Sequence, residues 1–201
     1  MGKTVIIIDH AHCGTTMLAG LLEMAGVPMV GTNFKEDKWE DLDIIDSLSS
    51  GNEHRFARLV RHRNEQHEIW GFKYAGAWKF MDVMLKYLTN PIFLVIYKDP
   101  VAVTMRRFAT RDVLVGKVKN TFKQFMEGIN GILETRQPVH VFSYEKAVVA
   151  PREFVQDLLD IIELDADVDN LAKFIQPNPD SPRKRYPSVK KWLKLEYSEE
   201  G

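Results

Sequence analysis

The sequence lacks several features that would each define a class of protein. Its 201 residues include a single cysteine, Cys13, so an internal disulfide framework is excluded and a reducing compartment fits. No apolar run approaches the ~18–20 residues of a membrane span, and the charged Asp9 comes too early for a signal peptide. We therefore expect a cytoplasmic protein that makes no contact with a membrane.

An excess of one charge is also lacking. The 27 Lys and Arg residues nearly balance the 28 Asp and Glu residues, which leaves a net charge of −1. The protein therefore has no overall basic field that would indicate nucleic acid as a partner. A composition that is 45% hydrophobic and 10% aromatic is typical of a globular protein. A chain of this length is expected to form one domain over residues 1–201.

Strand and helix patterns alternate along the chain. Short runs rich in β-branched and aromatic residues predict strands at 4–8, 69–72, 92–97 and 139–143. Helical patterns predict helices at 15–25, 42–49, 53–63, 78–87, 101–109, 120–135, 151–162 and 169–174. The alternation predicts an α/β, three-layer, P-loop-like fold, with a central parallel sheet flanked by helices. In such sheets, ligands bind beyond the carboxyl ends of the strands.

The last part of the sequence differs from the rest. Residues 175–201 form a tail that is first rich in proline and then basic, with Arg183-Lys184-Arg185 at its centre. Two interpretations stay open for this tail: a solvated surface, or a flexible basic segment that closes over an anionic ligand.

The turn after the first predicted strand is the most informative segment. Gly14, Thr15 and Thr16 open an amphipathic run there, which predicts a helix whose N-terminus is directed into a loop. Such a terminus presents unpaired N–H groups and the positive end of the helix dipole, and therefore binds phosphate or sulfate. A plain strand-to-helix turn is the alternative. A Walker A loop is excluded, because Asp9 stands at its first position and Thr15 where its lysine belongs.

A second basic site follows the strand predicted at 92–97. Lys98 ends this strand, and Pro100 suits the first turn of the next helix. Arg106 lies about two turns along that helix, so it can face the same side as Lys98. Two cations on rigid elements form a clamp suited to a phosphate monoester; the alternative is a pair of surface charges.

Together these segments resemble the sulfotransferase superfamily that uses 3′-phosphoadenosine-5′-phosphosulfate (PAPS), in its bacterial type. Members show Arg/Lys-Ser-Gly-Thr-Thr/Ser after the first strand, and later a strand that ends in Arg-Asp-Pro. Five stretches of this sequence match the family's motifs in the same order: His12-Cys13-Gly14-Thr15-Thr16, Trp39-Glu40-Asp41-Leu42-Asp43, Trp70-Gly71-Phe72-Lys73, Lys98-Asp99-Pro100 with Arg106 eight residues after Lys98, and Phe142-Ser143-Tyr144-Glu145.

The resemblance implies a role for each matching residue of the nucleotide site. The backbone amides from Cys13 to Thr16, through Gly14, with the hydroxyls of Thr15 and Thr16, would cradle the 5′-phosphosulfate. Lys98 and Arg106 would hold the 3′-phosphate. His12 stands where the family has a lysine or arginine that contacts the bridging oxygen. The chemistry would be in-line transfer that needs no metal.

The resemblance also implies residues for the acceptor side. Glu40 is the first candidate for the base that deprotonates the acceptor, and an exposed acidic loop residue is the alternative interpretation. His10 is the second candidate, because histidine titrates near neutral pH. Lys73 would lie near the transferred group and polarise it; alternatively, its ammonium extends past apolar neighbours to the surface.

These expectations define one function and two alternatives. The first is a sulfotransferase that moves a sulfuryl group from PAPS to a hydroxyl or amine of a small-molecule or carbohydrate acceptor. The second is a P-loop-like nucleotide kinase that uses ATP. The third is a module that binds the sulfonucleotide without transferring its sulfuryl group, because His12 replaces a permanent cation. The residues indicate no particular oligomeric state.

Overall fold

The computed structural model describes residues 2–8, 13–29, 34–35, 39–108, 115–134 and 137–175; for 34–35 and 105–108 it describes the backbone alone. The catalytic candidates His10 and His12 and most of the basic tail lie outside these residues. Within the described residues, no helix combines the length and the apolar character needed to cross a membrane.

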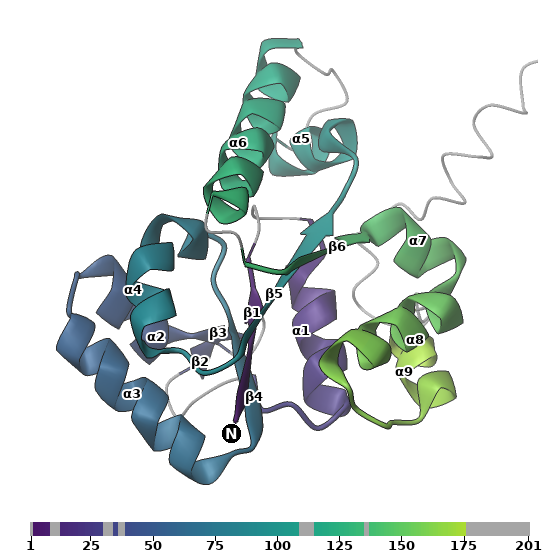
Figure 1. Cartoon of the computed structure of the whole chain (residues 1–201). Helices are drawn as coiled ribbons and strands as arrows, with labels where there is room; N and C mark the ends of the chain where they lie inside the picture. The colour runs from purple at the N-terminus through teal and green to yellow at the C-terminus, as the bar shows by residue number, and fades with distance from the viewer. Residues whose placement is uncertain are drawn as a thin grey trace, which may run out of the picture.

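A parallel sheet of four strands forms the centre of the molecule (Figure 1). The strands are β1 (Lys3–Ile7), β4 (Ile69–Lys73), β5 (Pro91–Tyr97) and β6 (Val139–Ser143), in the order β4-β1-β5-β6. Central strand β1 pairs with both β4 and β5. All four strands lie where the sequence predicts them, within a residue at either end. A two-stranded antiparallel sheet, β2 (Phe34–Lys35) and β3 (Glu40–Asp41), was not predicted.

The helices also follow the predicted order. They are α1 (Thr15–Met24), α2 (Leu42–Ser49), α3 (Glu53–Gln66), the 3₁₀ helix η1 (Ala77–Phe80), α4 (Met81–Tyr87), α5 (Pro100–Phe108), α6 (Val115–Leu133), α7 (Tyr144–Val149), α8 (Pro151–Ile162) and α9 (Val168–Ile175). Short α7 was not predicted, and the helix expected at 78–87 is divided into η1 and α4. Helix α6 begins five residues earlier than expected.

The sheet has an apolar core on each face. Alternate residues of β1 face opposite sides, so Val5 and Ile7 contribute to one core and Ile6 and Ile8 to the other. Helices α1, α7, α8 and α9 cover the first face, whereas α2, α3, η1 and α4 cover the second (Figure 1). This confirms the three-layer α/β prediction and brings the ends of β1, β4, β5 and β6 to one edge.

Candidate functional site

Helix α1 begins at the edge of the sheet where the strands end. Its N-cap is Gly14, which has φ 110° and ψ 7°, a conformation that glycine adopts without steric cost. Because glycine has no side chain to accept the first amide hydrogens of the helix, the positive end of the dipole is left for an anion. Thr15 is nearly buried and Thr16 is partly exposed beside it.

Gly14 is also required by a close approach from another element. A Cβ atom at this position would lie 2.5 Å from Cδ2 of Tyr144 and 3.3 Å from Cδ1 of Ile96. Tyr144 is the first residue of α7, so its ring packs directly against the turn. The turn is therefore shaped both by its own backbone and by the residue that follows β6.

Lys73 reaches the turn from the neighbouring strand β4. Its Nζ donates a hydrogen bond to Oγ1 of Thr16 at 3.4 Å and lies 3.6 Å from Oε1 of Glu40. Only 5% of the Lys73 side chain is exposed, against 32% for Glu40. This burial excludes the alternative interpretation, in which the ammonium of Lys73 extends to the surface. Glu40, Lys73 and Thr16, three candidates from separate parts of the sequence, thus lie together.

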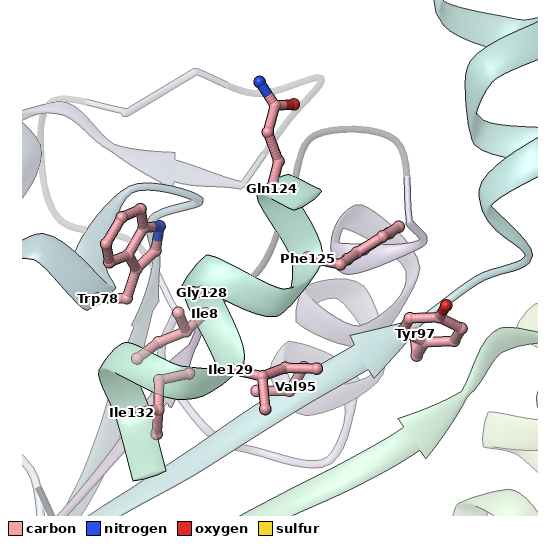
Figure 2. Close-up of a pocket in the computed structure, with 9 residues that line it drawn as sticks. All are labelled: Ile8, Trp78, Val95, Tyr97, Gln124, Phe125, Gly128, Ile129 and Ile132. Atoms are coloured by element: carbon pink, nitrogen blue, oxygen red, sulfur yellow. The ribbon is translucent and has the colours of Figure 1, made fainter. Parts of the chain in front are cut away.

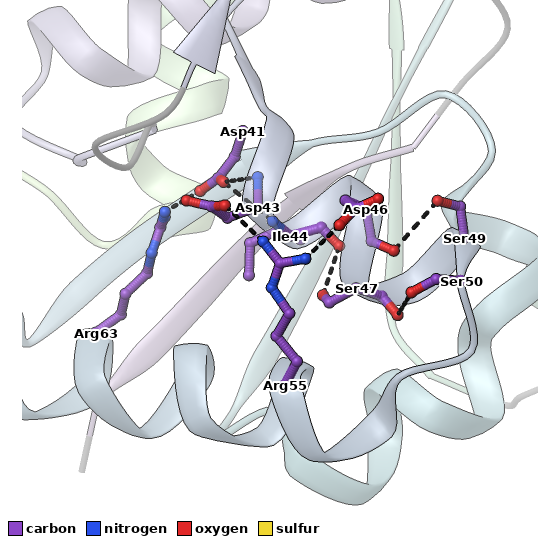
Figure 3. Close-up of polar contacts among 9 residues, drawn as sticks. All are labelled: Asp41, Asp43, Ile44, Asp46, Ser47, Ser49, Ser50, Arg55 and Arg63. Atoms are coloured by element: carbon purple, nitrogen blue, oxygen red, sulfur yellow. Dashed lines mark hydrogen bonds and ion pairs between the residues drawn. The ribbon is translucent and has the colours of Figure 1, made fainter.

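A buried ion pair holds the backbone beside Glu40. The carboxylate of Asp41, fully buried, pairs with the guanidinium of Arg63 from α3 (Figure 3). Asp41 also caps α2, because its Oδ1 accepts hydrogen bonds from the amides of Asp43 and Ile44, both at 3.1 Å. Burial lowers the pKa of Arg63 to about 10, so the guanidinium stays protonated at neutral pH and Asp41 faces a full positive charge.

Two further contacts fix this region. The Arg63 guanidinium lies 5.0 Å from the ring centre of Trp70, which belongs to β4, three residues before Lys73. Trp39, just before Glu40, has φ 54°, a left-handed conformation that costs roughly 1–2 kcal/mol for a residue with a Cβ. The same cluster therefore anchors the strand of Lys73 and the segment of Glu40.

The second basic site lies at the ends of β5 and β6. Nζ of Lys98 is 4.3 Å from the centre of the Tyr144 ring, a cation–π arrangement. The Glu145 carboxylate accepts a hydrogen bond from the Asp99 amide at 2.9 Å, which ties α7 to the end of β5. Asp99 in turn accepts from the amide of Ala102 at 2.7 Å and caps α5. Arg106 lies in α5, and the structure does not describe its side chain.

Cys13, at the start of the described turn, is fully buried in a small apolar cluster with Val103, Phe125 and the partly buried Tyr97. The rings of Tyr97 and Phe125 are 4.8 Å apart. Cys13 thus contributes apolar packing that joins the turn to α5 and α6.

An apolar pocket lies next to this cluster, between α6 and the sheet (Figure 2). Its walls are Ile8, Val95 and Tyr97 at the strand ends, Trp78 of η1, and Gln124, Phe125, Gly128, Ile129 and Ile132 of α6. The pocket is narrow: its volume of about 20 Å³ has room for about one water molecule. Among the residues with described side chains, no three His, Cys, Asp or Glu gather as a metal site requires.

Sequence reasoning gave no role to two of these residues. Arg63 continues the buried face of α3, seven residues after Phe56 and three after Val60; a charge in that register was the available signal. The resemblance includes Tyr144 in a motif but implies no role for it. Its position directly after a strand end, beside the charged Glu145, was the corresponding signal.

No protein-family model and no curated protein matches the sequence. Similar folds occur among solved structures. The sulfotransferase domain of the Synechococcus PCC 7002 olefin synthase is 13% identical, with a TM-score of 0.65, over 96% of this chain and 86% of that one. Mouse sulfotransferase SULT7A1, complexed with PAP, is 11% identical, with a TM-score of 0.52, over 86% of this chain and 63% of that one.

A kinase has a similar architecture. A sugar kinase from Janibacter sp. HTCC2649 is 15% identical, with a TM-score of 0.50, over 84% of this chain and 98% of that one. At these identities the likeness is one of fold, and it confirms the resemblance that the motifs indicated. The chain has a divergent sulfotransferase-like fold, in an architecture that P-loop kinases share.

Proposed function

We propose that the protein is a PAPS-dependent sulfotransferase whose acceptor is a small molecule. The observation that carries the proposal is the buried Lys73, which joins Thr16 of the turn to the carboxylate of Glu40. A Walker A loop supplies its cation from within the loop, whereas here the cation comes from β4. Transfer to a hydroxyl also requires a base that accepts the hydroxyl proton. The carboxylate of Glu40 lies beside that cation and can act as this base.

The proposed reaction assigns one task to each group. The acceptor oxygen attacks sulfur in line, and the bond between sulfur and the bridging phosphate oxygen breaks as the new S–O bond forms. Glu40 accepts the proton of the acceptor hydroxyl. Lys73 and the turn amides offset negative charge on the sulfuryl and bridging oxygens, and His12 is proposed to face the leaving phosphate.

The nucleotide half of the proposed site rests on Lys98 and Tyr144. The ammonium of Lys98 is partly exposed over the ring of Tyr144, which also contacts Gly14 of the turn. Tyr144 therefore contacts both the turn that is proposed to hold the 5′-phosphosulfate and the lysine that is proposed to hold the 3′-phosphate. We propose that Lys98 and Arg106 hold the 3′-phosphate, the group that distinguishes PAPS from other adenine nucleotides.

The apolar pocket supports a small-molecule acceptor in preference to a carbohydrate. Ile8, Val95 and Ile132 of its lining offer no side-chain hydrogen bonds to the hydroxyls of a sugar.

Binding of two matched nucleotides tests the donor. Adenosine 3′,5′-bisphosphate differs from AMP only in its 3′-phosphate. We expect the bisphosphate at about 100 times its Kd to stabilise the fold by about 2.7 kcal/mol, with a much smaller effect from AMP, in thermal-shift titrations. Equal stabilisation by both nucleotides, or stronger stabilisation by ATP with Mg²⁺, contradicts the proposal.

Transfer is tested with labelled PAPS and a panel of phenols and alkyl alcohols. We expect Glu40→Gln to abolish transfer and to leave binding of the bisphosphate intact. Glu53→Gln is the matched control, because Glu53 also pairs with a lysine, Lys86, but on the exposed surface of α3. If the Glu40→Gln variant transfers the sulfuryl group as fast as the parent, Glu40 is not the base.

The kinase fold match supports the second candidate, a nucleotide kinase, since this chain covers 98% of the Janibacter enzyme. Transfer of labelled phosphate from ATP, with no binding of the bisphosphate, would favour it. Tight binding of the bisphosphate with no transfer to any acceptor would instead favour the non-catalytic module.

A further inference from the structure

Helix α6 carries an apolar stripe on its outer side. Val115, Phe122, Met126 and Leu133 are 83%, 46%, 52% and 61% exposed, respectively. They lie on one side of the helix, next to the inner face that is buried through Phe125. Single exposed apolar residues are common, but a row of them along one helix marks an interaction surface.

The spacing of this stripe is the same in both directions. Its four residues follow one another at intervals of seven, four and seven. If a second copy of α6 is turned end to end, Val115 lies opposite Leu133 of that copy, and Phe122 lies opposite Met126. Intervals of seven and four keep apolar side chains on the seam of two packed helices, so this stripe is complementary to itself.

The charges beside the stripe are divided between the two halves of the helix. Lys119 and Lys123 are exposed in the first half, whereas Glu127 and Glu134 are exposed in the second half or just past its end. Lys123 and Glu127 also form an exposed pair within the helix, at 3.8 Å, which is worth little there. An antiparallel pair brings the lysines of one copy toward the glutamates of the other. A parallel pair would instead bring lysines toward lysines, so the charges select the antiparallel arrangement.

The exposure of its four residues makes this side of α6 accessible. Figure 1 shows α5 and α6 at the top of the molecule, beyond the helices that cover the two faces of the sheet. We propose that α6 pairs antiparallel with α6 of a second copy and forms a two-fold symmetric dimer. The same stripe then serves both partners, as in an isologous interface.

Sedimentation velocity over about 1 to 200 μM protein tests the dimer. We expect Met126→Lys to raise the dimer Kd by about 30-fold or more, as for a residue at the centre of an interface. Because Met126 is half exposed, the variant should keep the circular dichroism of the parent. Val149→Lys, at an apolar position of α7 that is 74% exposed, is the matched control and should not change the Kd.

A charge exchange tests whether these charged residues lie in the interface. One variant combines Lys119→Glu with Lys123→Glu, and the other combines Glu127→Lys with Glu134→Lys. We expect each variant to be monomeric alone and the equimolar mixture to form a heterodimer. A parent that stays monomeric over the whole range, variants that each remain dimeric, or a mixture that fails to associate would overturn the proposal; a monomer would indicate that the stripe binds another segment or protein.

Discussion

The two lysines that flank the turn are held in different ways. Lys73 is buried beside Glu40, next to the buried pair of Asp41 and Arg63. We call these four residues the ionic side. Lys98 is partly exposed and rests on an aromatic ring.

Lys98, Tyr144 and the tie from Glu145 to Asp99 form the aromatic side. A buried charge must keep a fixed counter-charge, because an unpaired one costs several kcal/mol. A partly exposed charge is also solvated by water. The ionic side therefore depends on its fixed counter-charges, whereas the lysine of the aromatic side rests on a ring and reaches solvent.

The largest expected effect comes from breaking the ionic side. Arg63→Ala leaves the buried carboxylate of Asp41 without its cation, and we expect a loss of about 3–5 kcal/mol in the free energy of unfolding. Arg55→Ala is the control: Arg55 lies on the same helix and pairs with Asp43 and Asp46 of α2, but on the surface (Figure 3). We expect it to cost about 0–1 kcal/mol. If urea denaturation shows that both variants lose the same free energy of unfolding, the buried ion pair does not stabilise the fold more than the surface pairs of Arg55.

Removing the charge of Lys73 separates its role in chemistry from its role in the fold. Lys73→Met keeps most of the side-chain volume, so we expect the fold to persist. Because Lys73 is proposed to offset charge at the transferred group, kcat should fall about 10²–10³-fold. The Kd for adenosine 3′,5′-bisphosphate, which has no sulfuryl group, should change little in calorimetry. If the loss appears in that Kd and kcat is unchanged, Lys73 belongs to the nucleotide site.

The sequence predicted the fold well because its signals are local. Each strand of the central sheet is a short β-branched run that ends at a polar residue or a turn, and alternation with helices defines a parallel sheet. The two-residue strands β2 and β3 carry no such run. Their pairing brings Glu40 opposite Lys35, a contact that depends on residues around them rather than on any local pattern.

The candidate site was predicted in part for a similar reason. Thr16, Glu40 and Lys73 came from motifs and do lie together. The buried pair of Asp41 and Arg63 joins residues 22 positions apart. The register of Arg63 in α3 indicates that its side chain is buried, but its partner is decided by packing between α2 and α3, and no local pattern indicates Asp41 as that partner.

The next prediction concerns the turn that lies between the two sides. Gly14→Ala introduces a Cβ at φ 110° that would lie 2.5 Å from the ring of Tyr144. We expect it to cost about 2–4 kcal/mol, from left-handed strain together with the steric clash. Gly26→Ala is the control, since Gly26 has φ 93° but no atom within 4 Å of the added Cβ. It should cost only the strain, about 1–2 kcal/mol. Equal costs would mean that Tyr144 moves away freely.

Removal of a charge from the aromatic side should change the free energies of binding and unfolding less than removal of a charge from the ionic side. We expect Lys98→Ala and Arg106→Ala each to weaken binding of adenosine 3′,5′-bisphosphate by about 1–3 kcal/mol, the range of a charge-assisted hydrogen bond. Neither should lower the free energy of unfolding by more than about 0.5 kcal/mol. AMP binding provides the control, because it should be unaffected. Unchanged binding of the bisphosphate in both variants rules out the clamp.

Tyr144 tests whether the aromatic side depends on the ring or on the hydroxyl. Tyr144→Phe keeps the face under Lys98 and the contact with Gly14, so binding of the bisphosphate should stay within about 0.5 kcal/mol of the parent. Tyr144→Leu removes the quadrupole and keeps apolar bulk. We expect it to weaken binding by about 0.5–1 kcal/mol, the strength of an exposed cation–π contact. If Tyr144→Phe is the weaker binder in calorimetry, the hydroxyl contacts the nucleotide, and the aromatic side holds its ligand through a hydrogen bond as well as through the ring.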